Sequence, residues 1–185
     1  SSIVNHTFLM HETLALIFAA TNNSSIAAHL LDILFAAIAI FFTYKLSSRN
    51  KHLAIITPLL VFLTPLFFAQ AGLLHQDLAT AALSLAGIYF FSQQRLLSAA
   101  IFLSIAVLIK ETAAITILII LLYQLLKEKL TRENIRKPII IATPLYILAI
   151  WAALNLYFHG WIFNPIAANA SSNIQPLGWV FIFFK

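Results

Sequence analysis

The chain has 185 residues, of which 62% are hydrophobic and 9% are charged, and its formal net charge is +5. Soluble domains are about 25% charged, so this composition excludes an ordinary globular domain and indicates several membrane-spanning helices. Cysteine is absent, which excludes disulfide bonds and thiolate metal sites. The positive charge lies mostly in short loops between apolar runs, which is typical of membrane topology and argues against a nucleic-acid partner.

The apolar runs predict an all-α, polytopic transmembrane helix bundle with short half-helices and an external juxtamembrane helix. The first run, 7–20, reaches only about 20 Å as a helix, and we expect it to lie at the membrane interface. The chain begins at Ser1 and ends inside an apolar run, so we interpret 1–185 as a single transmembrane domain of a longer protein, truncated at both ends. The expected spans are approximately 26–44, 53–70, 78–92, 96–109, 112–126 and 138–158, with the start of another over 177–185.

The basic residues predict an orientation. Nine of the eleven lysines and arginines fall in loops on one side of the alternating spans, and the positive-inside rule makes that side cytoplasmic. The other face, where the remaining polar residues gather, is then the outer or lumenal one. We therefore expect a multi-pass protein of a prokaryotic plasma membrane or, in a eukaryote, of the endoplasmic reticulum. The basic run 127–137 is expected to contact anionic lipid.

Asp77 stands in a short polar turn between two apolar runs. A charge so close to the hydrocarbon is costly and is typical of a functional site. Two interpretations remain open: the carboxylate caps the following helix and meets its dipole, or it binds an acceptor, a metal or a charged headgroup in an external cavity. Thr80, Ser84 and Gly87 share one face of that helix, and this stripe of small residues is predicted to pack against protein rather than lipid.

Lys110 and Glu111 interrupt the apolar run 96–126 and divide it into two short helices. Adjacent residues do not face each other on a helix, so the two are not an obvious pair. They form either a surface turn whose charges reach the headgroups, or a site in which Lys110 meets Asp77 or an anionic ligand such as phosphate.

The histidines are less informative. His75 and His6 are candidate metal ligands or acid–base groups, but no metal-ligand spacing accompanies them, which favours isolated surface histidines. Within the first expected span, Asp32 and His29 are three residues apart and are predicted to form a polar pair inside the bundle.

Three segments together resemble a known family. The run 5–9 and the apolar residues after it are similar to the His-Pro-Pro-Leu segment and half-helix of the integral-membrane GT-C glycosyltransferases, most closely the protein O-mannosyltransferases and lipid A aminoarabinose transferases. The run 65–89 resembles that family's proline-bearing helix, second external acidic residue and returning helix. The run 106–113 resembles its apolar helix ending in a lysine-containing turn. Two departures stand out: Thr7-Phe8 replaces two prolines, and the family's catalytic carboxylate would precede Ser1.

The resemblance implies a fragment of a membrane enzyme, inactive alone, that moves a sugar from a polyprenyl-phosphate donor to an acceptor hydroxyl on the outer or lumenal face. It implies Asp77 and Glu111 as catalytic residues, and Lys110, His75 and His6 as residues that contact the substrate or the donor phosphate. The implied partners are membrane lipid and the lipid-linked sugar.

The sequence leaves the cofactor open, a divalent metal included, as it does the oligomeric state, the donor sugar and the acceptor. The alternatives to an enzyme are a transporter or channel subunit, with Asp77, Lys110 and Asp32 lining a pathway, and a non-catalytic membrane scaffold.

Overall fold

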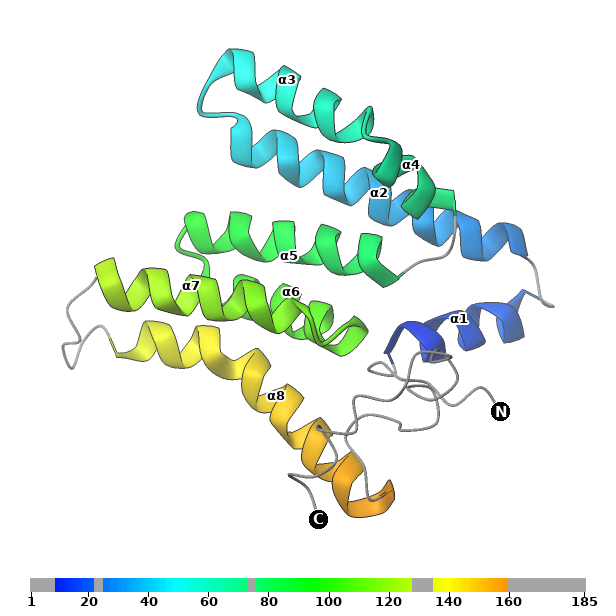
Figure 1. Ribbon diagram of the computed structural model, residues 1–185, viewed down its shortest axis with the longest axis vertical. Helices are drawn as coiled ribbons and strands as arrows, with labels where there is room; N and C mark the ends of the chain where they lie inside the picture. Colours follow the sequence, from blue (N-terminus) through cyan, green and yellow to red (C-terminus); the bar gives the residue numbers. More distant parts are fainter. Residues whose placement is uncertain (1–8, 22–24, 73–75, 128–134, 160–185) are drawn as a thin grey trace, which may run out of the picture.

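The computed structural model describes residues 9–21, 25–72, 76–127 and 135–159. These residues form eight helices and no strand, which confirms the predicted all-α class (Figure 1). The helices are α1 (Leu9–Ala20), α2 (Ser25–Ser47), α3 (Lys51–Phe62), α4 (Pro65–Gly72), α5 (Gln76–Ser92), α6 (Leu96–Ile109), α7 (Ala113–Lys127) and α8 (Arg136–His159).

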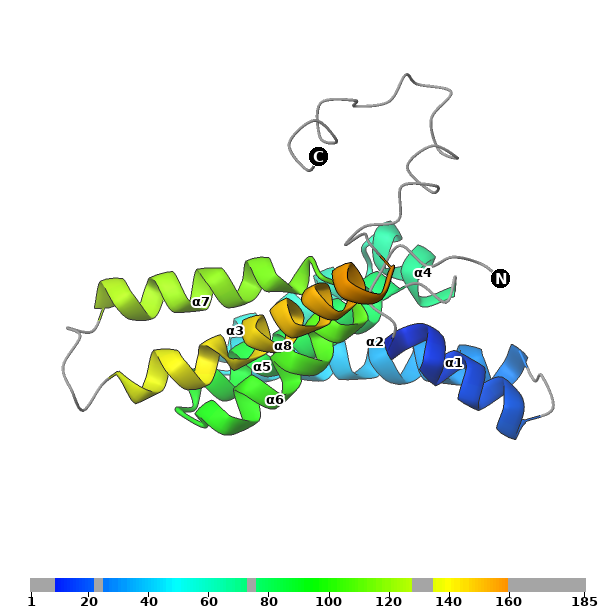
Figure 2. The ribbon, with the colours of Figure 1, turned by 90° about the horizontal axis from the view of Figure 1, so that it is seen from below.

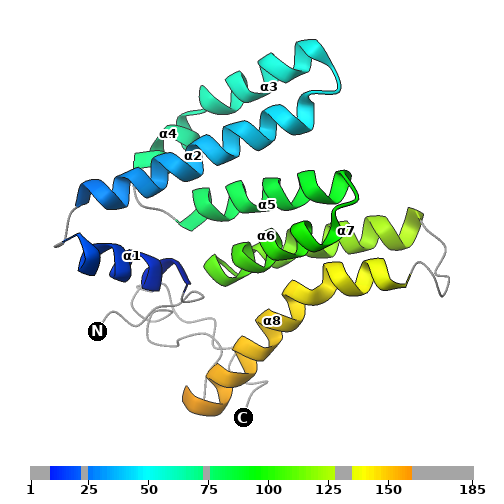
Figure 3. The same ribbon diagram turned by 180° about the vertical axis from the view of Figure 1, so that it is seen from behind.

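The helices run back and forth along one direction. Helix α5 packs between α2 and α6, α3 lies on α2, and α8 contacts both α6 and α7. Figures 1 and 3 accordingly show α3 and α8 at opposite edges of the bundle. Helices α6 and α7 overlap in Figure 1 but lie at different depths, as Figure 2 shows.

Two helices in the described ranges are long and apolar enough to cross a membrane, namely α2 and residues Arg136–Phe158 of α8. A third crossing is formed if α3 and α4 are counted as one bent span. Helices α6 and α7 are apolar but shorter, with 14 and 15 residues. The exposed side chains of α3 and α4 are mostly large and apolar, as expected for surfaces that face lipid.

Where the sequence predicts one continuous helix over 53–70, the structure has two helices that meet at a bend of 63°. The cause is Pro65, which has no N–H to continue the hydrogen-bond ladder. The N–H of Thr64 donates to the Val61 carbonyl at 3.1 Å, and the N–H of Phe67 then donates to the Thr64 carbonyl at 2.9 Å. Pro65 thus starts a new helix, the position that proline favours.

The core lies where α5 and α6 approach closely. Their facing residues are largely alanines that are fully buried, among them Ala79, Ala86, Ala99 and Ala106. Small side chains let two helix backbones come together where lipid offers no hydrophobic driving force. The predicted stripe of Thr80, Ser84 and Gly87 is indeed buried, which confirms that it faces protein. Phe90 of α5 and Phe102 of α6 extend the contact, since their rings stack with centroids 5.2 Å apart.

The connections divide into two kinds. The α2–α3 and α5–α6 connections, the end of α7 and the start of α8 lie at one end of the bundle, and the α6–α7 turn and the start of α5 lie at the other (Figure 1). We call the first the basic end, because the described cations there are Lys45, Arg49, Lys51, Arg95, Lys127, Arg136 and Lys137. We call the second the site end, because it carries Asp77, Lys110 and Glu111.

Gly87 is predicted to be intolerant of any side chain. A Cβ at this position would lie 2.6 Å from Cγ of Leu103, which is itself fully buried. Although alanine favours a helix by about 1 kcal/mol over glycine, we expect Gly87→Ala to lower the free energy of unfolding by about 1–3 kcal/mol through overpacking. Denaturation of the purified protein in detergent measures this change.

The matched control is Ala81→Leu, which adds a larger side chain to an exposed position of the same helix. It is expected to leave stability unchanged. Equal stability of Gly87→Ala and the unmodified protein would contradict the close approach of α5 and α6.

Candidate functional site

Asp77 and Lys110 meet at the site end, although 33 residues separate them. The Nζ of Lys110 donates a hydrogen bond to Oδ1 of Asp77, and the two side chains form an ion pair. Of the two partners that the sequence offers Lys110, an anionic ligand or Asp77, the structure shows Asp77.

The position of Lys110 follows from the way in which α6 ends. The last residue of α6, Ile109, is buried, and Lys110 adopts an extended backbone with φ −152° and ψ 126°. Its N–H still donates to the Ala106 carbonyl at 2.9 Å, while its carbonyl accepts from the N–H of Ala113 at 3.1 Å. Because Ala113 is buried as well, the reversal between α6 and α7 is fixed at both ends.

Asp77 is held in the first turn of α5. The helix begins at Gln76, so Asp77 lies inside the helix rather than directly before it. The hydroxyl of Thr80 donates to the Gln76 carbonyl at 2.8 Å, and Leu78 and Ala79 are buried, which together fix this turn. A carboxylate in the first turn also interacts favourably with the helix dipole.

The ion pair is open to one side. The Lys110 side chain is 18% exposed and that of Asp77 is 42% exposed, so the ammonium is the more enclosed partner. Glu111 follows Lys110 in the same turn and is half-buried. An ammonium that is partly withdrawn from water attracts an anion more strongly than one on an open surface. The arrangement therefore combines one enclosed cation with a carboxylate, that of Asp77, which an approaching ligand can reach.

The remaining predicted site residues are His6, His75, Asp32 and His29. His6 and His75 lie outside the described residues. Asp32 is fully buried in α2, whereas His29 is exposed, so the two differ in environment. Within the ranges that the structure describes, no three His, Asp or Glu side chains are grouped closely enough to hold a metal ion.

Two glutamines were not singled out from the sequence. Gln70 lies in α4, and Gln124 lies in α7 and is 5% exposed. The Oε1 atom of each is buried and accepts no hydrogen bond from the described part of the chain. Each glutamine is a lone amide in an apolar run, and this pattern could have identified both from the sequence. Buried polar groups in membrane helices are costly and mark functional positions.

One comparison with known proteins identifies a family. The model of the family described as dolichyl-phosphate-mannose-protein mannosyltransferase matches residues 5–158, which is most of the chain. No curated protein and no solved structure matches. The family match covers both members of the ion pair.

The ion pair predicts energetic coupling between its two residues. Because Asp77 is substantially exposed, we expect a double-mutant cycle of Asp77→Asn and Lys110→Met to give a coupling energy of up to about 1 kcal/mol in unfolding experiments. The control cycle combines Asp77→Asn with Lys45→Met at the basic end, where the two effects should add. A coupling no larger than that of the control cycle would show that the pair contributes nothing to stability.

Proposed function

The chain belongs to the dolichyl-phosphate-mannose-protein mannosyltransferase family, and on this premise we propose that it forms part of an enzyme that transfers a sugar from a polyprenyl-phosphate donor to an acceptor hydroxyl. The family membership favours a membrane glycosyltransferase over the transporter, channel and scaffold alternatives. The apolar helices are consistent with a lipid environment for such an enzyme.

The observation that carries the proposal is the enclosed ammonium of Lys110 beside Asp77 at the site end. In the proposed reaction, the acceptor oxygen forms a bond to the anomeric carbon while the bond from that carbon to the donor phosphate oxygen breaks. The phosphate leaves with the electron pair, and a base takes the hydroxyl proton. The transition state therefore gathers negative charge on the leaving phosphate.

Lys110 is proposed to stabilise that charge. Its ammonium is a compact point charge of the kind that binds phosphate. The buried side chains of Ile109 and Ala113 flank its turn and limit water, and electrostatic stabilisation is strongest where water is excluded. The extended backbone at Lys110 restricts the positions that its ammonium group can occupy, and it does so before a ligand binds.

Asp77 is proposed to orient Lys110 and the acceptor. As the more exposed partner, its carboxylate has room to accept a hydrogen bond from an acceptor hydroxyl. Glu111 is proposed as a second carboxylate at the same opening. His75 and His6 remain proposed contacts to the substrate or the donor phosphate.

The site end is proposed to face the outside of the cell or the lumen. The opposite end carries seven described cations, and none of the four acidic residues in the described ranges (Glu12, Asp32, Asp77 and Glu111) lies there. Positively charged loops stay on the cytoplasmic side. The donor phosphate would then approach Lys110 from the outer leaflet.

Removing the proposed phosphate contact should slow transfer. In the full-length protein, we expect Lys110→Ala to lower kcat/KM for the lipid-linked sugar by about 10²–10³-fold, the range seen when one transition-state hydrogen-bond donor is lost. Lys110→Arg should retain more activity because it keeps the charge. Asp77→Asn should also lower transfer, because the amide no longer fixes the ammonium by charge.

Expression and stability of each variant are measured alongside transfer. The control is Lys51→Ala, which removes a lysine from the basic end and should leave transfer unchanged. Unaltered rates in well-folded Lys110→Ala and Asp77→Asn variants would refute these roles.

The orientation is tested by thiol labelling. The chain has no cysteine, so single cysteines can be introduced without background. Thr112→Cys at the site end and Gln93→Cys at the basic end are both at exposed positions. We expect a membrane-impermeant reagent to label the former in intact cells or sealed lumenal-side-out vesicles, and the latter only after permeabilisation. Labelling of both from one side would contradict the proposed orientation.

A further inference from the structure

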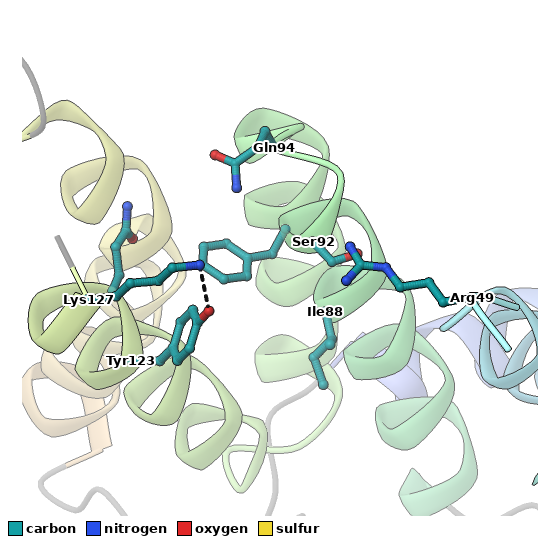
Figure 4. A pocket seen from close by; sticks show the side chains of 8 residues that line it. Arg49, Ile88, Ser92, Gln94, Tyr123 and Lys127 are labelled. Carbon is teal, nitrogen blue, oxygen red and sulfur yellow. Dashed lines mark hydrogen bonds between the residues drawn. The ribbon is translucent and has the colours of Figure 1, made fainter. Parts of the chain in front are cut away.

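A second pocket lies at the basic end, far from the Asp77–Lys110 pair. It is a cavity of about 300 Å³ between the α2–α3 connection, the end of α5 and the end of α7. Figure 4 shows Arg49 and Lys127 reaching toward each other from opposite sides, with Ile88 and Ser92 between them. The proposed glycosyl transfer does not use this pocket.

The residues that line the pocket include two cations and no carboxylate. Lys127 is positioned by Tyr123, since its Nζ donates to the tyrosine hydroxyl at 2.9 Å and lies 5.3 Å from the centre of the ring. Gln94 adds a side-chain amide that can donate hydrogen bonds, whereas the Ser92 hydroxyl donates to the Tyr89 carbonyl at 2.7 Å. Two cations with a neutral hydrogen-bond donor beside them are suited to an anion with several oxygen atoms.

The backbone around the pocket is fixed on two sides. Arg49 directly precedes Asn50, whose side chain caps α3 by accepting from the N–H groups of His52 and Leu53 at 3.0 and 3.4 Å. This cap defines where the chain turns after Arg49. Arg49 therefore projects from the short α2–α3 connection and Lys127 from the last residue of α7.

Gln94 is held by the end of α5. The N–H of Arg95 donates to the Phe90 carbonyl and that of Gln94 to the Phe91 carbonyl, both at 2.9 Å, which is the Schellman pattern. Gln94 occupies its left-handed position with φ 60°, where glycine is usual. The chain thus accepts a less favourable backbone at the residue that brings an amide to the pocket.

The surface next to the pocket is apolar. Ile119, Tyr123 and Lys127 follow each other at intervals of four along α7, so they share one face. Ile119 is 62% exposed and Tyr123 is 50% exposed. A molecule whose charged group contacts Lys127 can therefore lay a hydrocarbon chain along the same helix. A free phosphate would leave this apolar surface unused.

We propose that this pocket binds the phosphodiester headgroup of an anionic phospholipid, with Arg49 and Lys127 on either side of the phosphate and an acyl chain along α7. Gln124 lines the pocket, and its buried Oε1 accepts no hydrogen bond from the described part of the chain. The lipid would hold together the ends of α2, α5 and α7 on the basic side of the bundle.

Native mass spectrometry of the full-length protein in detergent tests the proposal. The probes are phosphatidylglycerol, phosphatidylcholine with the same acyl chains, and soluble glycerol phosphate as a competitor. We expect phosphatidylglycerol to be retained in preference to phosphatidylcholine and to resist the competitor. Arg49→Gln and Lys127→Gln should each weaken its binding by about fivefold, the effect of one cation near an anionic membrane surface.

The matched controls are Lys51→Gln and Arg95→Gln, which remove cations from the same end but outside the pocket lining. They should leave lipid binding within about twofold of the unmodified protein. The proposal is overturned if the Arg49→Gln and Lys127→Gln variants bind phosphatidylglycerol as tightly as the unmodified protein does. It is also overturned if the control variants lose as much affinity for this lipid as the two pocket variants. Equal retention of phosphatidylcholine would exclude recognition of the charge. Displacement of the lipid by glycerol phosphate at comparable concentration would assign the pocket to a soluble phosphate instead.

Discussion

The close approach of α5 and α6 is the constraint on which the rest of the structure depends. Alanines and Gly87 remove the side-chain bulk that would otherwise separate the two helices. The helices run antiparallel from the Schellman turn at Gln94, and the segments 77–92 and 96–110 have almost the same length. Since both rise by about 1.5 Å per residue, their far ends arrive at the same level. That is why a carboxylate at the start of α5 and a lysine after α6 can form an ion pair across 33 residues.

The same hairpin connects the two ends of the molecule. Its turn presents Ser92 and Gln94 to the basic pocket, while its open end carries Asp77 and Lys110. The small residues pack closely along the whole hairpin, so α5 cannot slide along α6 without a clash between Leu103 and Gly87. The positions of the two ends are therefore fixed relative to each other. Helices α2 and α8 then cover the outer faces of the hairpin. The two candidate sites are thus separate in chemistry but share one scaffold.

Much of this arrangement was predictable from sequence, and the exceptions have physical causes. The all-α class followed from apolar runs and scarce charge, and the buried stripe on α5 followed from residues spaced by three and four. The division of α3 from α4 was missed, because membrane helices often tolerate proline and only the local hydrogen bonds show that Pro65 starts a new helix. The pairing of Lys110 with Asp77 was one of two open interpretations. The sequence predicts that both residues lie on the same side of the membrane, but it does not give the distance between their helices. The pocket at the basic end was not predicted, because its residues come from the α2–α3 connection, the end of α5 and the end of α7, and only the folded structure brings these segments together.

Under the proposed function, the cations at the two ends of the bundle have different tasks. At the basic end the cations are numerous and mostly exposed, which suits the proposed contact with anionic lipid. At the site end a single lysine is 18% exposed, held by one carboxylate and placed by an extended backbone residue between two buried positions. A lone charge held in this way loses little freedom when a phosphate arrives, and preorganisation of that kind is what electrostatic catalysis requires. The partly exposed Asp77 keeps the ammonium in place without sealing it, because an ion pair that water still reaches is weak enough to yield to a ligand with more charge.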